Sequence, residues 1–187
     1  MKRALLVIDV QNEYFSGMLP ITYPHGHLTN ILRTMDTAAA HGIPRVVIQH
    51  TFLQPDKPYF KRGTSEWQLH SEVLARPHDL YIEKHLPGSF TATPLESWLR
   101  QQRIDTVVIT GYMTHMCCDT TARQAVHRGF TVEFLNDATG TLSLKNTAGE
   151  VSDEALQRSF LCAQQMLLSE VLSTDVWCQQ IALQARR

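Results

Sequence analysis

The sequence lacks the features that mark membrane proteins and nucleic-acid-binding proteins. Over its 187 residues no apolar run approaches the roughly 20 residues that a membrane-spanning helix needs. Lys and Arg number 17, Asp and Glu number 18, and the net charge of -1 comes without any basic block. Because nucleic acids and anionic membrane surfaces select clustered positive charge, we expect neither as a partner.

Cysteine is scarce and does not follow the pattern of secreted proteins. Cysteines that form a disulfide framework or a CxxC metal pair recur at set spacings, and these four do not. A redox pair of adjacent cysteines is disfavoured, because a disulfide between neighbours is strained. The apolar run 4–8 is also too short for a signal peptide and stops at Asp9. We therefore expect a cytoplasmic protein. The four cysteines are Cys117, Cys118, Cys162 and Cys178.

Short apolar runs alternate along the chain with segments whose apolar residues recur at helical spacing. Such alternation is typical of an α/β protein with a mainly parallel sheet that helices cover on both faces. The length fits one domain, residues 1–187, and no linker or repeat divides it. The predicted strands are Ala4–Ile8, Arg45–Gln49, Leu80–Ile82, Thr106–Ile109, Thr131–Leu135 and Glu170–Leu172. The predicted helices are Leu28–Ala40, Leu95–Gln102, Cys118–His127, Asp153–Leu168 and Val176–Ala182.

The longest irregular stretch begins at Thr51 and runs to Gly63, rich in proline and aromatic residues. Long loops inside compact domains tend to be functional or mobile. We interpret this one, with its continuation to Trp67, as a lid or an interface element that carries substrate specificity.

Three chemically reactive residues follow three of the predicted strands. Asp9 ends the first strand, Lys84 follows the third and Cys117 follows the fourth after a short turn. In an open parallel sheet, ligands bind outside the carboxyl ends of the strands, near the point where strand order reverses. The polarity of the strands therefore predicts that these three side chains share one edge.

The three groups together suit nucleophilic catalysis. A thiol at the start of a helix is expected to favour its thiolate, and an adjacent ammonium is expected to lower its pKa from about 8.5. A carboxylate beside the thiol can take its proton. The thiolate then attacks a planar carbonyl to form a thioester, and backbone N–H groups of the turn can stabilise the oxyanion by on the order of 3 kcal/mol each.

The order of these motifs resembles the isochorismatase-like cysteine hydrolases, which include nicotinamidases, N-carbamoylsarcosine amidases and ureidoacrylate-type amidases. The surroundings of Tyr14 and Leu19 look most similar to poorly characterised members of the family, including streptothricin-hydrolase-like ones. The resemblance covers nearly the whole chain. It rests on the segments 4–12, 83–84, 88–90 and 111–117, and on Thr93, Leu95, Thr121, Arg123, Ala125, Gly129, Asp137 and Ala138.

The resemblance implies roles for several residues. Asp9, Lys84 and Cys117 correspond to the catalytic triad, and the N–H groups of Met113 and Cys117 correspond to the oxyanion hole. It also implies a cis peptide between Tyr112 and Met113. The implied fold is a Rossmann-like three-layer α-β-α sandwich with a six-stranded, mainly parallel sheet, and the implied assembly is a homodimer or homotetramer. The same motif leaves Cys118 to pack inward.

The resemblance also bears on substrate and metal binding. Gln11 and Phe15, on the loop after Asp9, and Tyr112 are expected to contact the substrate. Nicotinamidases hold a metal through an Asp-x-His segment after the second strand, and this chain has only His50 there. We therefore predict no catalytic metal and no other cofactor.

The sequence thus predicts a hydrolase that cleaves an amide or ureido C–N bond of a small molecule through a thioester. One alternative is a vinyl-ether hydrolase of the isochorismatase kind, which protonates its substrate through the aspartate and needs no thiol. The other is a non-catalytic scaffold of the same fold, which has no reason to retain all three reactive groups.

Overall fold

The computed structural model of the protein describes residues 1–54 and 56–184. Its strands are β1 (Arg3–Ile8), β2 (Arg45–His50), β3 (Leu80–Lys84), β4 (Thr106–Tyr112), β5 (Thr131–Gly140), β6 (Leu144–Asn146), β7 (Gly149–Val151) and β8 (Glu170–Leu172). Its α-helices are α1 (His27–Ala40), α2 (Ser71–Leu74), α3 (Leu95–Gln101), α4 (Asp119–His127), α5 (Asp153–Leu167) and α6 (Thr174–Gln184). Two short helical turns are η1 (Asn12–Tyr14) and η2 (Thr114–Cys118).

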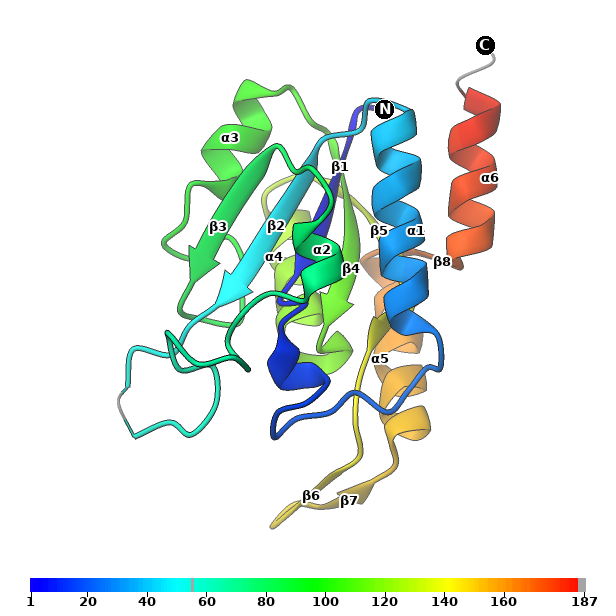
Figure 1. The fold of residues 1–187 in the computed structure, drawn as a ribbon. Helices are drawn as coiled ribbons and strands as arrows, with labels where there is room; N and C mark the ends of the chain where they lie inside the picture. The colour runs from blue at the N-terminus through cyan, green and yellow to red at the C-terminus, as the bar shows by residue number, and fades with distance from the viewer. Residues whose placement is uncertain (55, 185–187) are drawn as a thin grey trace.

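Six strands form one parallel sheet in the order β3-β2-β1-β4-β5-β8. The chain builds outward from β1 to β3, returns to place β4 beside β1, and builds outward again on the other side (Figure 1). The strand order therefore reverses between β1 and β4, which is where open α/β sheets bind ligands. The predicted Rossmann-like three-layer fold with a six-stranded sheet is confirmed.

The alternating side chains of β1 show how the sheet is covered on both faces. Leu5 and Val7 enter one apolar cluster, and Leu6 and Ile8 enter another. Helices α1, α2 and α6 pack on the first cluster, and α3 and α4 pack on the second with α5 beside them. Figure 1 shows α1 and α6 side by side along one face. Because helices cover both faces, every residue of the central strands β1 and β4 is buried.

The main differences from the sequence prediction lie in short elements and strand ends. The β6–β7 hairpin is exposed and polar, so it carries no alternating pattern. Helix α2 has only four residues, which is too short for a helical period to show. Strand β4 continues through Gly111 and Tyr112 because Gly111 still pairs with Ile8 of β1. Strand β3 likewise runs on to Lys84, which pairs with His50.

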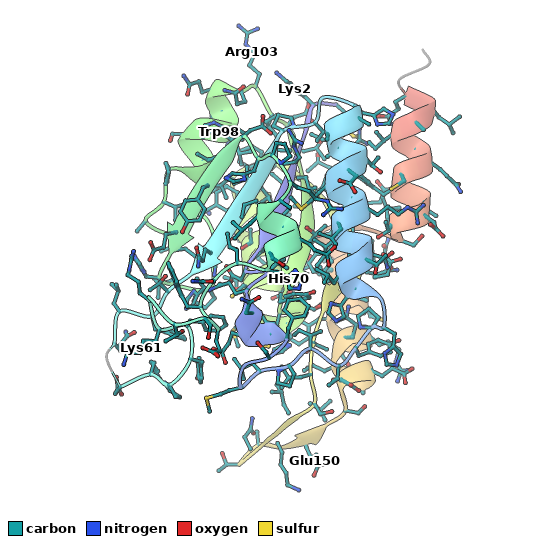
Figure 2. All side chains as sticks on the ribbon, viewed as in Figure 1. Lys2, Lys61, His70, Trp98, Arg103 and Glu150 are labelled. Atoms are coloured by element: carbon teal, nitrogen blue, oxygen red, sulfur yellow. The ribbon has the colours of Figure 1, made fainter. Side chains whose placement is uncertain are left out.

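Several irregular segments gather at the carboxyl edge of the sheet. The loop after β2 and the β6–β7 hairpin extend from this edge, and Figure 2 labels Lys61 and Glu150 on them. Lys2 and Arg103 mark the opposite edge.

Every helix among the described residues is too short or too polar to cross a lipid bilayer. The expected homodimer or homotetramer stays a prediction.

Candidate active site

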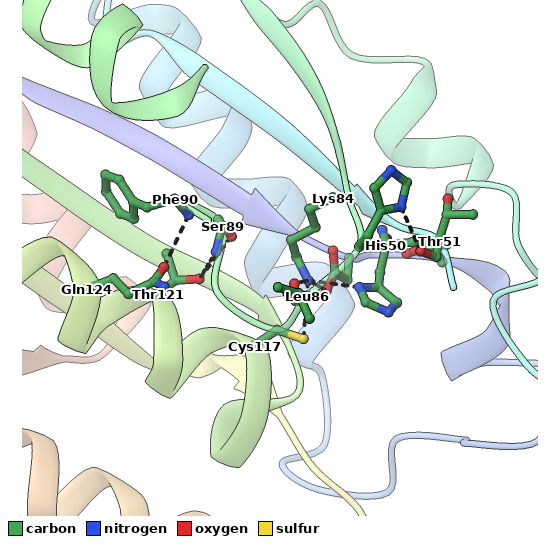
Figure 3. A network of polar contacts seen from close by, with 12 residues as sticks. His50, Thr51, Lys84, Leu86, Ser89, Phe90, Cys117, Thr121 and Gln124 are labelled. Carbon is green, nitrogen blue, oxygen red and sulfur yellow. Dashed lines mark hydrogen bonds and ion pairs between the residues drawn. The ribbon is translucent and has the colours of Figure 1, made fainter. Parts of the chain in front are cut away.

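The ends of three strands bring Asp9, Lys84 and Cys117 together. Lys84 is the last residue of β3, Asp9 follows β1, and Cys117 lies in η2 after β4. The Lys84 Nζ atom is 2.7 Å from Asp9 Oδ2. It is also 3.3 Å from Cys117 Sγ (Figure 3). The exposed fractions are 0% for Asp9, 1% for Lys84 and 6% for Cys117. The structure thus places a carboxylate, an ammonium and a thiol in one nearly dry site.

The Lys84 ammonium has three N–H donors and meets three acceptors at hydrogen-bonding angles. These are Cys117 Sγ at 3.3 Å, the Leu86 carbonyl at 3.2 Å and His50 Nδ1 at 3.3 Å. Asp9 Oδ2 is closer still, and the Lys84 ammonium stabilises the charge of this carboxylate both as an ion-pair partner and as a hydrogen-bond donor. The Cys117 thiol also lies within hydrogen-bonding reach of Asp9, so its proton has a short route to the carboxylate.

The backbone of Asp9 adopts an uncommon conformation. Its φ of 51° lies in the left-handed region, which Asp tolerates better than most residues. The Asp9 N–H donates to the Ile48 carbonyl at 2.9 Å, and the Asp9 carbonyl accepts from the Gln11 N–H at 2.8 Å. These bonds fix the turn that ends β1. Backbone outliers of this kind concentrate at functional sites.

Glycine is required at position 111, where β1 and β4 approach each other beside Asp9. Gly111 has a φ of 106°, and a Cβ atom there would lie 2.0 Å from the Ile8 carbonyl oxygen. Only glycine permits both this conformation and this contact. The close approach holds the turn that carries Cys117 against the turn that carries Asp9.

The turn that carries Cys117 has the predicted cis peptide between Tyr112 and Met113. Met113 is extended, and its carbonyl accepts hydrogen bonds from the N–H groups of Met116 at 3.0 Å and Cys118 at 3.2 Å. Cys118 is fully buried in the apolar cluster beneath the turn, as predicted. The oxyanion role of the Met113 and Cys117 N–H groups stays a prediction.

The electrostatics of the site overturn the expectation of a resting thiolate. Burial raises the pKa of the Cys117 thiol to about 12, although the Lys84 ammonium acts in the opposite direction. Burial also raises the pKa of Asp9, again opposed by Lys84. Burial lowers the pKa of Lys84, but the negative charges of Asp9 and Cys117 outweigh this effect and the net shift is upward. The effect of desolvation on the pKa of Cys117 is therefore larger than the opposing effects of the Lys84 cation and the helix terminus, and Cys117 rests as a thiol.

Two of the three predicted substrate contacts are engaged within the protein. Gln11 is fully buried; its amide nitrogen donates to the carbonyls of His50 and Trp67, and its amide oxygen accepts from the His50 N–H. Tyr112 is also fully buried, and its hydroxyl pairs with His27 Nδ1. Both side chains therefore support neighbouring segments, and neither presents a free polar group to a substrate.

Phe15, the third predicted substrate contact, is half-buried in an aromatic cluster. Its ring lies 4.6 Å from that of His70, 5.9 Å from that of Tyr112 and 6.0 Å from that of His27. A partly exposed aromatic face remains compatible with substrate binding, so the role of Phe15 stays a prediction.

The structure adds two residues that the sequence analysis did not place in the site. His50 contacts Lys84 directly, and it closes β2 one residue beyond the predicted strand end. Tyr14 is 2% exposed, and burial followed by the charges of Cys117 and Asp9 raises its pKa well above the ordinary value. The rule that strand ends converge at one edge would have found His50. No sequence pattern singles out Tyr14.

No metal site accompanies this cluster in the part of the chain that the structure describes. Residues 1–54 and 56–184 contain no group of three or more His, Cys, Asp and Glu side chains placed to hold a metal ion. His50 directs its Nδ1 toward the Lys84 ammonium, which is the reverse of a metal-ligand arrangement. Burial and the Lys84 charge lower the pKa of His50 to about 3, so the ring is neutral.

Comparison with known proteins identifies the family. The model of the isochorismatase domain matches residues 3–164. The chain belongs to the isochorismatase family. An uncharacterized isochorismatase family protein of Bacillus subtilis, YddQ, is 30% identical over 178 residues, which cover 95% of this chain and 99% of that protein.

Two further isochorismatase-family matches are informative. Nicotinamidase 3 of Arabidopsis thaliana is 32% identical over 152 residues, which cover 75% of this chain and 74% of that protein. The crystal structure of a candidate isochorismatase of Burkholderia xenovorans LB400 is 47% identical with a TM-score of 0.93, over 96% of this chain and 87% of that one. The motif resemblance is confirmed, and the chain is an isochorismatase-family hydrolase.

Proposed function

We propose that this hydrolase is a cysteine amidohydrolase that cleaves a C–N bond of a small amide or ureido compound. The observation that carries the proposal is the position of the Lys84 ammonium, which lies against both Asp9 and Cys117 in a nearly dry site. An amide substrate class is further supported by the name of the relative Nicotinamidase 3.

The first half of the reaction forms the acyl-enzyme. The Cys117 thiol proton moves to Asp9 as the Sγ–C bond forms, and the carbonyl oxygen becomes an oxyanion. The C–N bond then breaks, and Asp9 returns its proton to the leaving nitrogen. The product of this half is a thioester on Cys117 and a free amine or ammonia.

Lys84 makes this proton transfer feasible without creating a new buried charge. Before transfer the ammonium faces the Asp9 carboxylate, and after transfer it faces the Cys117 thiolate. The net charge of the three groups is the same in both states. Burial raises the pKa values of both Asp9 and Cys117, and the Lys84 cation opposes that rise at each group, so it stabilises the negative charge on either side of the transfer.

The second half of the reaction hydrolyses the thioester. Asp9, again ionised, takes a proton from an attacking water molecule, and the C–Sγ bond breaks. The thiolate that leaves recovers its proton from Asp9. In both halves the N–H groups of Met113 and Cys117 are the proposed donors to the oxyanion, and each such donor contributes on the order of 3 kcal/mol.

The test is ammonia release from a panel of small primary amides and N-carbamoyl compounds. Wild-type protein is compared with Cys117→Ala, and Cys118→Ala serves as the matched control because it removes the neighbouring thiol. We expect Cys117→Ala to abolish release and Cys118→Ala to retain it. Mass spectrometry of the quenched wild-type reaction is expected to find the acyl group on the peptide that contains Cys117.

The outcomes separate the proposal from its rivals. Ammonia release that survives Cys117→Ala contradicts the thioester route. A vinyl ether assayed beside the amides tests the other chemistry: its hydrolysis by both wild type and Cys117→Ala, without ammonia release from any amide, favours the reaction in which Asp9 acts alone as the acid. Absence of turnover on every amide and on the vinyl ether, with no acyl adduct on Cys117, favours a non-catalytic scaffold.

A further inference from the structure

His50 and Lys84 are direct neighbours on adjacent strands. They form a register pair between β2 and β3, so their side chains emerge on the same face of the sheet at its carboxyl edge. His50 is 4% exposed. Figure 3 shows its ring beside the Lys84 ammonium, which also faces Cys117 and Leu86. A buried polar ring against the ammonium of the proposed triad is not explained by packing alone.

The contact fixes the state of the imidazole. An ammonium can only donate, so His50 Nδ1 at 3.3 Å must be unprotonated and the ring proton must reside on Nε2. The charges that face the ring are those of Lys84 and His85, and both disfavour protonation of His50. The imidazole is therefore a permanent, neutral acceptor for one N–H of Lys84.

The surroundings of His50 hold the ring in place. The His50 N–H donates to Gln11 Oε1 at 2.8 Å, and the His50 carbonyl accepts from Gln11 Nε2 at 3.0 Å. The ring meets Phe52 and Phe60 nearly perpendicularly, at centroid distances of 4.5 Å and 5.3 Å. A backbone clamp and two aromatic edges therefore give the Nδ1 atom a fixed direction. This also gives Gln11 a purpose other than substrate contact.

We propose that His50 is a positioning residue, whose Nδ1 holds one N–H of Lys84 so that another points at Cys117 and the ammonium does not turn wholly toward Asp9. The inference rests on the proposed function, because it concerns how the proposed triad is kept ready. The Leu86 carbonyl holds the remaining N–H. Held in this way, the ammonium stabilises the Cys117 thiolate directly as well as the Asp9 carboxylate.

Loss of the His50 acceptor has a definite consequence. One N–H of Lys84 is left without a partner in a nearly dry site, which is costly. The nearest other acceptor is Asp9 Oδ2, 2.7 Å from Nζ, so the ammonium shifts further toward it and away from Cys117. A stronger hydrogen bond lowers the pKa of the carboxyl, and loss of the N–H from sulfur raises the pKa of the thiol.

The other titratable groups next to Cys117 do not change their protonation state at neutral pH, so they do not affect a comparison of thiol reactivity between variants. Tyr14 and Cys118 face Cys117, and burial raises both of their pKa values well above the ordinary ones. Both groups therefore remain neutral at neutral pH, and a change in thiol reactivity there reports on Lys84 and Asp9.

The experiment measures the alkylation rate of Cys117 by iodoacetamide from neutral to alkaline pH. Mass spectrometry locates the adduct and separates it from the other cysteines. The test variant is His50→Leu, which keeps an apolar side chain and removes the acceptor. His50→Asn restores an acceptor, because its Oδ1 stands near the position of Nδ1. His85→Leu is the matched control, since His85 Nδ1 contacts the Thr51 carbonyl and not Lys84.

We expect Cys117 of His50→Leu to react about tenfold more slowly at neutral pH, which corresponds to a rise of about one unit in the thiol pKa. His50→Asn and His85→Leu are expected to stay within about twofold of wild type. A wild-type rate in His50→Leu overturns the proposal, and so does a rate in His50→Asn as low as that of His50→Leu. If His50→Leu fails to fold, His50→Phe replaces it and keeps an aromatic ring against Phe52 and Phe60.

The readout needs no substrate. A wild-type protein that releases no ammonia from any amide contradicts the proposed function and leaves the alkylation comparison valid. Conversely, an unchanged alkylation profile in His50→Leu contradicts the role of His50 and leaves amide hydrolysis standing.

Discussion

Replacement of Lys84 by methionine tests the electrostatic core of the site through stability alone. Lys84 and Asp9 are 1% and 0% exposed, and their charged atoms are 2.7 Å apart. Methionine fills a similar volume but leaves the Asp9 carboxylate alone in a nearly dry site. Removing one partner of a buried ion pair costs about 3–5 kcal/mol, so the unfolding free energy of Lys84→Met is expected to fall by that amount at alkaline pH.

The loss of unfolding free energy in Lys84→Met should depend on pH, and the protonation of Asp9 determines whether the loss grows or shrinks as pH rises. Burial already raises the pKa of Asp9, and Lys84→Met removes the ion pair and hydrogen bond that most oppose that rise. The folded variant then binds a proton that the unfolded chain, with a carboxyl pKa of about 3.9, does not. The stabilisation from this proton is complete below the unfolded pKa and is lost as pH rises through the folded pKa. Between the two values the unfolding free energy should fall by about 1.4 kcal/mol per pH unit.

Urea denaturation of wild type and variant at a series of pH values measures this slope. Asp9→Asn with Lys84→Met removes both charges and should recover most of the loss, because no lone buried charge remains. Lys145→Met is the surface control: the Lys145–Glu150 pair is 79% and 67% exposed, and such pairs contribute at most about 1 kcal/mol. A Lys84→Met variant as stable as wild type at every pH would refute the reasoning, and so would a loss that does not vary with pH.

Three further outcomes are expected. Asp9 must be ionised to act as the base, so kcat/KM on an amide should fall as pH drops through the raised pKa of Asp9, and a pH–rate profile with no acidic limb contradicts this role. Cys118→Ala should lower the unfolding free energy by about 1 kcal/mol, because it leaves a small cavity, and denaturation measures this loss. Cys117→Ala should leave the protein folded but inactive in the ammonia-release assay. Gly111→Ala should destabilise by more than about 3 kcal/mol or prevent folding, because its Cβ meets the Ile8 carbonyl oxygen at 2.0 Å; a normal denaturation midpoint would argue against that clash.

Much of the fold was predictable from local patterns. The runs around β1, β2, β4 and β5 place apolar residues on both faces of the sheet. Such runs between amphipathic helices have few other solutions than a parallel sheet in three layers. Elements that carry no such pattern were not found. The β6–β7 hairpin is exposed and α2 is a single turn, so neither element produces a periodic pattern of apolar residues in the sequence.

The candidate site was predictable in position and less so in its chemical state. Strand polarity alone places Asp9, Lys84 and Cys117 at one edge, since each follows or ends a strand of the same sheet. The expected thiolate was wrong because a pKa depends on how completely folding removes water, and spacing along the chain does not report burial. For the same reason Gln11 was assigned to substrate, whereas the structure ties its amide to His50 and Trp67.

The amino-acid sequence by itself determined the layered α/β fold, the family and the three residues at the sheet edge, because these follow from periodicity and strand direction. Only the tertiary structure decided that the thiol keeps its proton and that Lys84 directs an N–H at His50. These facts depend on dehydration and on angles between side chains from separate strands. Both the dehydration and these angles arise only when the separate strands assemble into the sheet, so no local segment of the sequence determines them.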